Sequence, residues 1–307
     1  MRPLSELAAA IDRWHATSGR HPDWLPGLTL SRASAVTEPL SDITRPVLAL
    51  IAQGAKRTVL ADQIYDYRAG QYLIATVDLP LTAQVTEAPF LALGLPLKQH
   101  LIAELLLESS SGARDEPDDS GVLVSDASGD LVDAVVRLLR LAEHPEDFAV
   151  LAPAAEREIH WRLMNGPHAA TVRRIGLPGS RVALVGQAVR WLAERFDQPI
   201  RIADLAAHVG VSVPTLNRHF RAVTAMSPLQ YQKQLRLQRA RVELLAAPGD
   251  VAAAGYAVGY DSPSQFSREY RRQFGAPPGQ DAARLLTASP RLDLTSRGPS
   301  TEEERGW

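Results

Sequence analysis

The spacing of hydrophobic residues predicts a chain that begins with a helix, continues in strands and ends in helices. Within residues 1–18, four apolar side chains recur at helical spacing on one face: Leu4, Leu7, Ile11 and Trp14. Residues 46–86 differ, because short apolar or alternating runs rich in β-branched and aromatic residues follow one another there. Turn residues at Ala55, 61–62 and 68–70 separate these runs. This pattern predicts a small antiparallel barrel or sandwich, which PFLALGLPL continues before the helical run HLIAELLLE.

Helical spacing returns after a polar and acidic segment, SSSGARDEPDDSG, at residues 109–121. This segment is predicted to be the least ordered part of the chain away from its ends. Residues 131–142 share an apolar face, and Pro145 is predicted to end that helix. Pro153 and Gly166 bracket a second predicted helix. The following segment, up to Ser180, is interpreted as a connection between two domains.

Nearly everything after Arg181 has helical periodicity. A short helix is predicted at 202–208, and Ser212 is a suitable N-cap for the next helix. A long basic helix is predicted at 228–246, and the pattern of short helix, turn and helix then recurs in 251–274. The tail after residue 288 has little apolar surface to bury and is predicted to be disordered.

Two segments of the C-terminal part have the same pattern, SVPTLNRHF from Ser212 and SPSQFSREY from Ser262. A short helix, a glycine-containing turn and a second helix form a helix-turn-helix unit, whose second helix enters the major groove of DNA. Two copies therefore predict a protein that contacts two adjacent grooves. The joining helix 228–246 would be about 30 Å long, close to the ~34 Å between successive major grooves on one face of the duplex.

Side chains near the start of each second helix suit contacts with DNA. Asn217 carries an amide that can pair with adenine, and Arg218 and Arg268 carry the guanidinium fork that suits guanine. Neutral side chains suited to phosphates or base edges are Ser212, Thr215, Ser262, Ser264 and Gln265. Basic side chains that would hold phosphates or keep the joining helix soluble are Lys233, Arg236, Arg239, Arg241, Arg271 and Arg272. In the alternative interpretation the helix pairs are only structural, and Arg218 and Arg268 are surface salt-bridge partners, with Glu269 nearby.

Charge and composition narrow the class of protein. Residues 180–288 hold 14 basic and 8 acidic side chains, a net charge of +6, whereas residues 1–179 carry −7. A basic segment beside an acidic one favours a polyanionic partner for the basic part, although a charge of this size is also common on solvated surfaces. The chain has no cysteine, no apolar run long enough to span a membrane and no signal-peptide pattern at its N-terminus, so a cytoplasmic protein is expected.

The C-terminal segment resembles a known family. IADLAAHVGVSVPTLNRHFRAVTAMSPLQYQKQLRLQRARVELL, followed by VGYDSPSQFSREYRRQFGAPP, is similar to the DNA-binding module of the AraC/XylS family of transcription regulators. The resemblance covers roughly 183–287 and implies seven helices that bind DNA as two helix-turn-helix units and regulate a nearby promoter. The family's recognition positions fall on Pro214, Asn217, Arg218, Pro263, Ser264 and Arg268.

The sequence departs from the family's pattern at two places. Pro214 and Pro263 stand where some members carry large polar or aromatic side chains, and a proline at a helix start shapes the helix or touches a thymine methyl rather than donating a hydrogen bond. The usual aromatic residue after the last proline pair is missing, since GQDAARLL follows. That second departure bears on the packing of the final helix.

Residues 44–108, with GAKR, YDYRAGQYLIATVDLPL and PFLALGLPL, look like the AraC-type N-terminal region of one branch of the family. The resemblance implies a cupin-like barrel that senses a small molecule and carries dimer contacts. The expected fold is therefore α+β, with an N-terminal effector-sensing and dimerisation domain at 1–170, a DNA-binding domain at 180–288 and a disordered tail at 289–307. Double-stranded promoter DNA and a small-molecule effector are the expected partners, and RNA polymerase is a candidate.

Several N-terminal side chains are candidates without an assigned role. Tyr65, Tyr67 and Tyr72 have the size and polar tips of pocket residues, or belong to the core or the barrel exterior. Lys56 and Arg57 could meet an anionic effector, or are solvated cations at a turn. Helices 131–142 and 153–165 carry a homodimer contact or only cover the barrel, with these candidates for the contact: Leu131, Val135, Leu138, Ile159 and Leu163.

An enzyme is not expected. Residues 44–90 contain no histidine, and His100, His144, His160 and His168 are scattered, so neither a metal site nor a cofactor is predicted. A cysteine nucleophile is excluded by composition, and no GxSxG, Walker-type or GxGxxG loop occurs. The remaining alternative to an effector-responsive regulator is an effector-independent repressor or architectural DNA-binding protein. The length of the N-terminal half favours the effector-responsive regulator, because dimerisation alone does not need so many residues.

Overall fold

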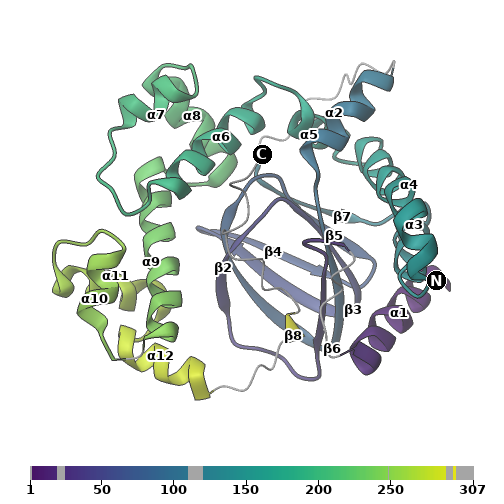
Figure 1. The fold of residues 1–307 in the computed structure, drawn as a ribbon, viewed down its shortest axis with the longest axis horizontal. Coiled ribbons are helices and arrows are strands. Elements are labelled where there is room, and N and C mark those ends of the chain that lie inside the picture. The colour runs from purple at the N-terminus through teal and green to yellow at the C-terminus, as the bar shows by residue number, and fades with distance from the viewer. Residues whose placement is uncertain (1, 19–24, 110–119, 248, 288–292, 295–307) are drawn as a thin grey trace.

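The computed structural model describes residues 2–18, 25–109, 120–247, 249–287 and 293–294. It has the expected α+β architecture: an antiparallel β unit flanked by helices, followed by an all-helical C-terminal region (Figure 1). The predicted disordered tail lies almost entirely outside the described residues, as does most of the acidic segment at 109–121. The first helix, α1 (Arg2–Ser18), buries Leu7 and Ile11 completely, in agreement with its predicted apolar face.

The β unit is one antiparallel sheet that bends back on itself. Its strands are β1 (Thr29–Ala33), β2 (Leu40–Thr44), β3 (Val47–Leu60), β4 (Gln63–Arg68), β5 (Gln71–Ala75), β6 (Leu79–Pro96), β7 (Val122–Asp126) and the short β8 (Asp293–Leu294). The long strands β3 and β6 pair along most of their length. The first part of β3 also pairs with β5 and its second part with β4, while β6 pairs with β2 and then with β1. The curled sheet agrees with the expected barrel-like unit.

The bend occurs where β3 contains a glycine with positive φ. Gly54 has φ 78°, and a Cβ at this position would lie 2.4 Å from the carbonyl oxygen of Glu87. The register with β6 shifts between Ile51 and Lys56, as expected for bulges that bend a strand. The sequence predicted two separate strands divided at Ala55. That prediction was wrong, because the irregularity bends one 14-residue strand without ending it.

Four strands were not predicted: β1, β2, β7 and β8. The two-residue β8 lies in the tail that was predicted to be disordered and pairs with β1, while the other three strands are each five residues long. So short a segment gives too few alternations to distinguish a strand from a loop, and these three strands exist because β6 and β5 offer them an edge to pair with.

Four helices that lie between β6 and the C-terminal region in the sequence cover the β unit: α2 (Gln99–Glu108), α3 (Gly129–Leu141), α4 (Pro145–Met164) and α5 (Ala169–Gly176). Two expectations need correction. Pro145 opens α4 at its first turn and Pro153 lies inside it, so Pro153 does not start that helix. The predicted connection at 165–180 contains α5, two residues of which, Val172 and Ile175, enter the core.

The five candidates for a dimer contact all lie in the core. Leu131, Val135, Leu138, Ile159 and Leu163 are each exposed by 3% or less. Their side chains cover the barrel, which was the alternative interpretation, and they are not available at the surface of the chain.

The C-terminal region contains seven helices among the described residues. They are α6 (Arg181–Glu194), α7 (Ile202–His208), α8 (Val213–Thr224), α9 (Pro228–Ala246), α10 (Val251–Ala257), α11 (Pro263–Phe274) and α12 (Pro278–Thr287). The repeat is confirmed, since α7–α8 and α10–α11 are equivalent helix pairs that both pack against α9 or its neighbours. Figure 1 shows the first pair near the start of α9 and the second pair farther along it.

The first helix pair is fixed to the β unit. Tyr231 on α9 is completely buried, and its hydroxyl donates a hydrogen bond to the carbonyl oxygen of Asp78 at 2.8 Å. The backbone N–H of Gly121, just before β7, donates to the carbonyl oxygen of Val223 on α8 at 2.9 Å. Apolar side chains of the first pair therefore continue the N-terminal core, whereas those of the second pair form a separate cluster.

Candidate DNA interface

The two second helices, α8 and α11, begin with the same local structure. Ser212 lies before α8, and its hydroxyl accepts a hydrogen bond from the backbone N–H of Thr215. Ser262 caps α11 in the same way by accepting from the backbone N–H of Gln265. A proline follows in the first turn of each helix, where its missing N–H is not needed. The predicted N-caps are confirmed, and both serine hydroxyls are occupied at the helix starts.

The buried faces of α8 and α11 also correspond. Leu216 and Phe220 on α8 are exposed by 2% and 0%, and their counterparts Phe266 and Tyr270 on α11 are both completely buried. The apolar face of each helix packs inside its helix pair. The opposite, polar face of each helix is therefore exposed to solvent.

The outer faces hold most of the predicted DNA contacts. Seven of the ten predicted side chains are exposed: Ser212, Pro214, Asn217 and Arg218 in the first unit, and Ser264, Gln265 and Arg268 in the second. The remaining three, Thr215, Ser262 and Pro263, are partly buried at the helix starts. Neither Arg218 nor Arg268 has an ion pair or hydrogen bond among the described residues. The alternative in which they serve as surface salt-bridge partners therefore has no support in the structure.

Glu269 on α11 binds other residues than the sequence suggested. Its carboxylate accepts from the Lys233 ammonium at 3.0 Å and from the Tyr260 hydroxyl at 2.8 Å, while the Gln265 amide lies 3.4 Å away. Burial by itself would raise the pKa of Glu269, but these three donors hold it below its usual range. Glu269 therefore stays ionised and joins Lys233 of α9 to α11.

The basic side chains of α9 mostly have structural roles. Arg236 donates to the carbonyl oxygens of Phe196 at 2.6 Å, Gly259 at 2.8 Å and Gln198 at 3.1 Å. It thereby joins the loop between α6 and α7 to the turn between α10 and α11. These internal bonds leave little of Arg236 for a phosphate.

Arg241 is buried and cannot reach DNA. It forms an ion pair with Asp281 on α12 at 2.9 Å, and the Tyr270 hydroxyl donates to the same carboxylate at 2.9 Å. Burial alone would raise the pKa of Asp281, but the guanidinium groups of Arg241 and Arg284 hold it below its usual range. The predicted phosphate or solubility role of Arg241 was wrong. The same cluster explains how α12 is anchored although the aromatic residue common in this position is missing.

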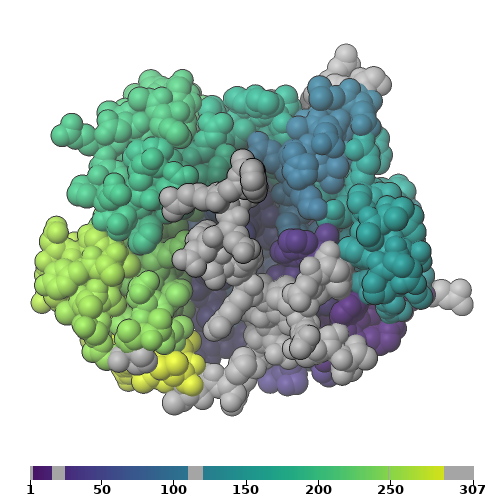
Figure 2. Space-filling model, in the orientation of Figure 1, coloured from purple at the N-terminus to yellow at the C-terminus, as the bar shows by residue number. Residues whose placement is uncertain are grey.

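The two units lie side by side on one part of the surface, as Figure 2 shows at the end of the molecule away from α3 and α4. The helix that joins them, α9, has 19 residues and is therefore about 28 Å long. Two second helices held by such a spacer are suited to adjacent major grooves of one duplex.

Comparisons with known proteins agree with this arrangement. Residues 24–171 match a family described as the AraC-type transcriptional regulator N-terminus, and residues 205–284 match a helix-turn-helix domain. The regulatory protein SoxS of Escherichia coli K12 is 35% identical over 106 residues, which cover 34% of this chain and 99% of SoxS. The chain belongs to the AraC/XylS family of transcription regulators.

Three further comparisons involve one longer relative and two solved structures. The transcriptional regulator ArgR of Pseudomonas aeruginosa is 31% identical over 149 residues, which cover 48% of this chain and 45% of ArgR, so the match spans less than half of that relative. A crystal structure of ToxT from Vibrio cholerae O395 superposes with a TM-score of 0.53 over 85% of this chain and 98% of ToxT, at 9% identity. Another ToxT structure, with bound unsaturated fatty acid, gives the same TM-score over 83% of this chain and 94% of that one, at 10% identity. At these identities the likeness shows a shared fold alone.

The resemblance to the family predicted the positions on the outer faces of α8 and α11. It did not predict the internal residues that hold these helices in place. Glu269, Arg236 and Asp281 came to light only in the structure, because their partners lie 9 to 40 residues away in the chain. The one signal available in the sequence was the cluster of charges on α9, which was interpreted as facing DNA.

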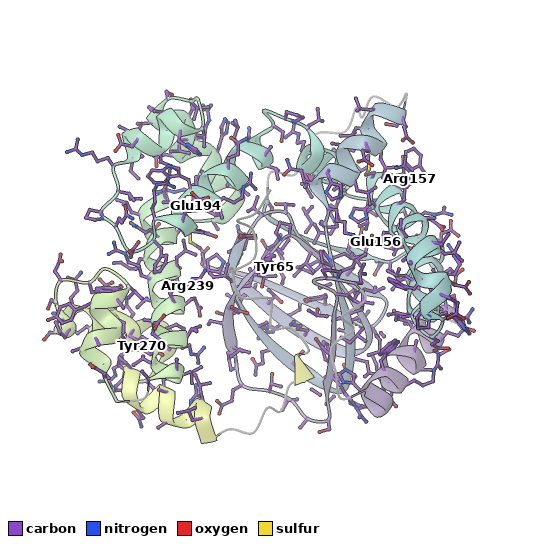
Figure 3. All side chains as sticks on the ribbon, in the orientation of Figure 1. Tyr65, Glu156, Arg157, Glu194, Arg239 and Tyr270 are labelled. Carbon is purple, nitrogen blue, oxygen red and sulfur yellow. The ribbon has the colours of Figure 1, made fainter. Side chains whose placement is uncertain are left out.

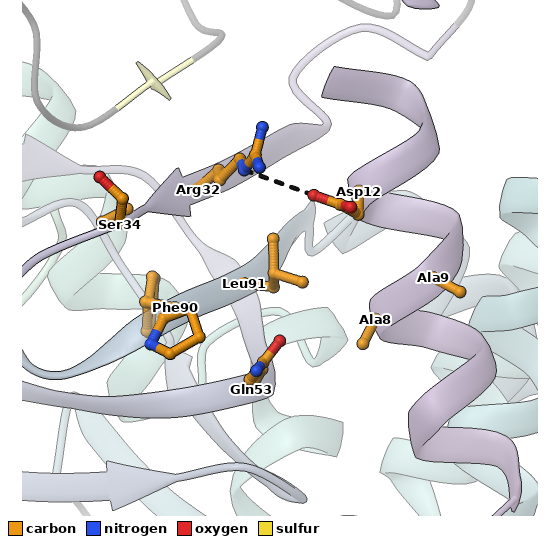
Figure 4. Close-up of a pocket in the computed structure, with 10 residues that line it drawn as sticks. Ala8, Ala9, Asp12, Arg32, Ser34, Gln53, Phe90 and Leu91 are labelled. Atoms are coloured by element: carbon orange, nitrogen blue, oxygen red, sulfur yellow. Dashed lines mark ion pairs between the residues drawn. The ribbon is translucent and has the colours of Figure 1, made fainter. Parts of the chain in front are cut away.

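Two pockets of moderate size border the β unit in the part of the chain that the structure describes. One of about 350 Å³ lies between α1 and the outer surface of the sheet, with Ala8 and Phe90 among its lining residues and an Arg32–Asp12 ion pair at its edge (Figure 4). The other, of about 130 Å³, lies between the β unit and α6, where it is lined by Asp78 and Arg190 among others.

The three candidate tyrosines have different environments. Tyr67 is exposed by 3%, and burial raises the pKa of its hydroxyl to about 12. Tyr72 is exposed by 2%, and burial raises the pKa of its hydroxyl as well. Tyr65 is partly buried, with its hydroxyl 3.4 Å from the Ser120 hydroxyl. Within the described ranges, no helix is both long and apolar enough to cross a membrane, and no three acidic or histidine side chains gather into a potential metal site.

Proposed function

We propose that this protein is a sequence-specific DNA-binding transcription regulator that contacts promoter DNA through the outer faces of α8 and α11. The observation that carries the proposal is the pair of equivalent arginines, Arg218 and Arg268, both exposed and without an ion pair in the described chain. A bidentate contact from an arginine guanidinium to guanine is the commonest specific contact in the major groove. The contact set is the one predicted from sequence, centred on Asn217, Arg218, Ser264 and Arg268.

The N-terminal domain is proposed to sense a small organic molecule. The support is the match to the AraC-type N-terminal region together with a barrel-like sheet of the size that can enclose one ligand. A ToxT structure with a bound unsaturated fatty acid shows that a protein of this fold accepts such a molecule. Membership of a regulator family argues against an enzyme. An effector-independent repressor remains the competing function, and it differs in needing no ligand for regulation.

The proposed division into domains is 1–170 for sensing and 180–288 for DNA binding, in a cytoplasmic protein. For a homodimer, the proposed contact moves to exposed residues of α4 such as Val150 and Trp161, which are 74% and 38% exposed, because the residues first considered are buried. RNA polymerase would be a partner at promoters where the protein activates transcription.

The test is a gel-shift titration of the full chain against duplex fragments from the promoter regions beside its own gene, with random duplex DNA as the control. We expect at least one fragment to bind more tightly than random DNA, with an affinity that falls steeply as salt rises, since phosphate contacts release counterions. Binding that is equal for all fragments would reduce the protein to an architectural DNA-binding protein. The absence of any salt-sensitive binding would contradict the proposal.

A further inference from the structure

Lys56 carries an ammonium group on the inner face of the curled sheet. In the register of the strands, Lys56 on β3 is opposite Tyr67 on β4 and opposite Val85 on β6. Directly opposed residues of an antiparallel pair point to the same face. Tyr67 and Val85 are exposed by only 3% and 1%, so this face is the interior. Lys56 itself is partly buried and keeps some accessible surface.

The neighbouring positions confirm which side is which. Arg57, the next residue along β3, pairs with Asp66 at 2.7 Å on the opposite face, and both side chains are about half exposed. Ile64 on that same outer face is 61% exposed. Arg57 is therefore solvated and paired on the outer face, whereas its neighbour Lys56 is directed inward.

The inward cation has no anionic partner among the described residues. No hydrogen bond or ion pair joins Lys56 to any of them, and burial is the only influence on its pKa, which falls to about 8. An uncompensated charge in a desolvated position is unfavourable, so natural proteins rarely keep one without a use. Thr58, two residues further along the inner face, is 2% exposed and lies opposite Tyr65, so it adds a hydroxyl group to the same side of the sheet.

The arrangement indicates what kind of molecule would fit. A single ammonium compensates a single negative charge, whereas a phosphate ester would bring about −1.5 to −2 and is usually held by several donors. The surroundings of Lys56 are apolar and aromatic, with Val85 and Tyr67 as nearest cross-strand neighbours, and suit a hydrocarbon or aromatic body. Tyr65, which Figure 3 shows in the region of the barrel, presents another hydroxyl from the same face of β4.

We propose that the inner face of the sheet around Lys56 binds a small organic acid, whose carboxylate pairs with the Lys56 ammonium and whose apolar body lies against Val85 and Tyr67. This inference rests on the proposed sensing function and specifies its ligand class. Neutral sugars, amines and metal ions are disfavoured by the same cation.

The test measures binding of simple acids to the purified full chain. The probes are benzoate and hexanoate at millimolar concentration, each compared with the alcohol and the amine of the same carbon skeleton and with inorganic phosphate. Thermal-shift and calorimetric titrations should detect the carboxylates and give at least a tenfold weaker response to the matched alcohols and amines, the effect of losing one charge-assisted bond. A stronger response to phosphate than to the carboxylates would contradict the assignment of the ligand class.

Two variants separate Lys56 from a general charge effect. Lys56→Met keeps an unbranched side chain that is one atom shorter and removes its charge, and it should lower carboxylate affinity at least tenfold. It should also raise the thermal midpoint of the ligand-free chain, because an uncompensated buried charge is removed. Arg57→Met removes the adjacent outer cation and should leave carboxylate binding unchanged. Equal losses in both variants, or a lower midpoint for ligand-free Lys56→Met, would overturn the proposal.

Proton linkage gives an independent measurement. With a pKa of about 8, the Lys56 amine is half protonated at pH 8, and a bound carboxylate would raise that pKa. Calorimetry in buffers of different ionisation enthalpy should then show uptake of about half a proton per carboxylate at pH 8 and none in Lys56→Met. Gel shifts on the same preparations keep the two proposals apart. If the wild-type chain binds DNA but shows no preference for carboxylates, this inference alone is refuted. If the wild-type chain does not bind DNA, the proposed function is refuted.

Discussion

At the scale of single residues, Arg218 and Arg268 give the most direct test of the two-unit interface. Replacing either one with alanine should cost ~1–3 kcal/mol on the specific site, because a bidentate contact to a base is lost, and less on random DNA. Gel-shift competition against site variants should place the two losses about one helical turn apart, ~10 base pairs. If Arg268→Ala weakens specific and random DNA equally, the second unit holds only phosphates and the first unit alone determines sequence.

A second residue-scale prediction concerns His160 in α4, which is completely buried. Its Nε2 accepts a hydrogen bond from the backbone N–H of Lys98 at 3.0 Å, and its Nδ1–H donates to the carbonyl oxygen of Glu156 at 2.8 Å. Burial lowers the pKa of His160 below its ordinary value, helped by the charges of Lys98 and His100 and opposed by Glu156. As the pH falls, the imidazole of His160 is therefore protonated at a higher pH in the unfolded chain than in the folded chain.

The sign of the pH effect follows from that lowered pKa. The stabilising contribution is complete above the unfolded pKa of about 6.5 and is lost as the pH falls below it. Denaturant unfolding at about pH 7.5 and pH 5.5 should show a smaller drop in the free energy of unfolding for His160→Gln than for the wild type, since glutamine keeps an acceptor but does not titrate. An equal drop in both proteins would show that other groups, such as the carboxyls, govern the acid sensitivity.

At the scale of elements, the contact between β7 and α8 depends on a glycine. A Cβ on Gly121 would lie 2.2 Å from the carbonyl oxygen of Val223, a backbone atom that cannot move aside without shifting α8. Gly121→Ala should therefore break this backbone hydrogen bond and destabilise the chain by about 1–3 kcal/mol, with faster amide exchange at the end of α8. Gly129→Ala is the matched control, because a Cβ there meets no atom within 4 Å and should be neutral or slightly stabilising. Equal behaviour of both variants would mean that β7 and α8 are not coupled.

The elements also show how far sequence patterns reach. Helices α8 and α11 were predicted with their caps because their signals are local: a serine, a proline and an apolar face within twelve residues. Strands β1, β2 and β7 were missed because they depend on pairing with distant strands. The inward direction of Lys56 could not be predicted either. The bulges in β3 shift its register with β6 before that position, and alternation alone no longer tells which face a side chain occupies.

The exposed residues of the candidate DNA interface were easier to predict than the internal residues that hold its helices in place. The exposed residues Asn217, Arg218 and Arg268 follow from the repeat, since the buried half of each helix fixes the other half. Arg236 and Arg241 carry the same charge and lie on an equally basic helix, yet their guanidinium groups bind carbonyls and a buried carboxylate. Nothing in a single sequence distinguishes a cation that meets DNA from one that holds two helix pairs together, because the difference lies in residues brought near by the fold.

At the scale of the whole molecule, the two helix pairs have unequal attachments. The first pair shares its buried cluster with the β unit, and the second has its own, smaller cluster around Phe266 and Tyr270. Hydrogen-exchange mass spectrometry of the full chain should therefore show that α10 and α11 open at lower free energy than α7 and α8, as an independent cooperative unit. Equal protection of both pairs over a denaturant series would show that the C-terminal helices unfold together with the barrel.

The boundary between these two clusters lies within α9 and suggests where the protein could be recombined. Leu235 belongs to the first cluster and Leu237 to the second, with Arg236 between them bonded to carbonyls on both sides. A chimera that joins this chain up to Arg236 to the remainder of a relative would keep each cluster intact, provided that the relative supplies a glycine turn equivalent to Gly259. Such a hybrid would retain the sensing half and half of the operator preference, while the other half of the operator would follow the donor.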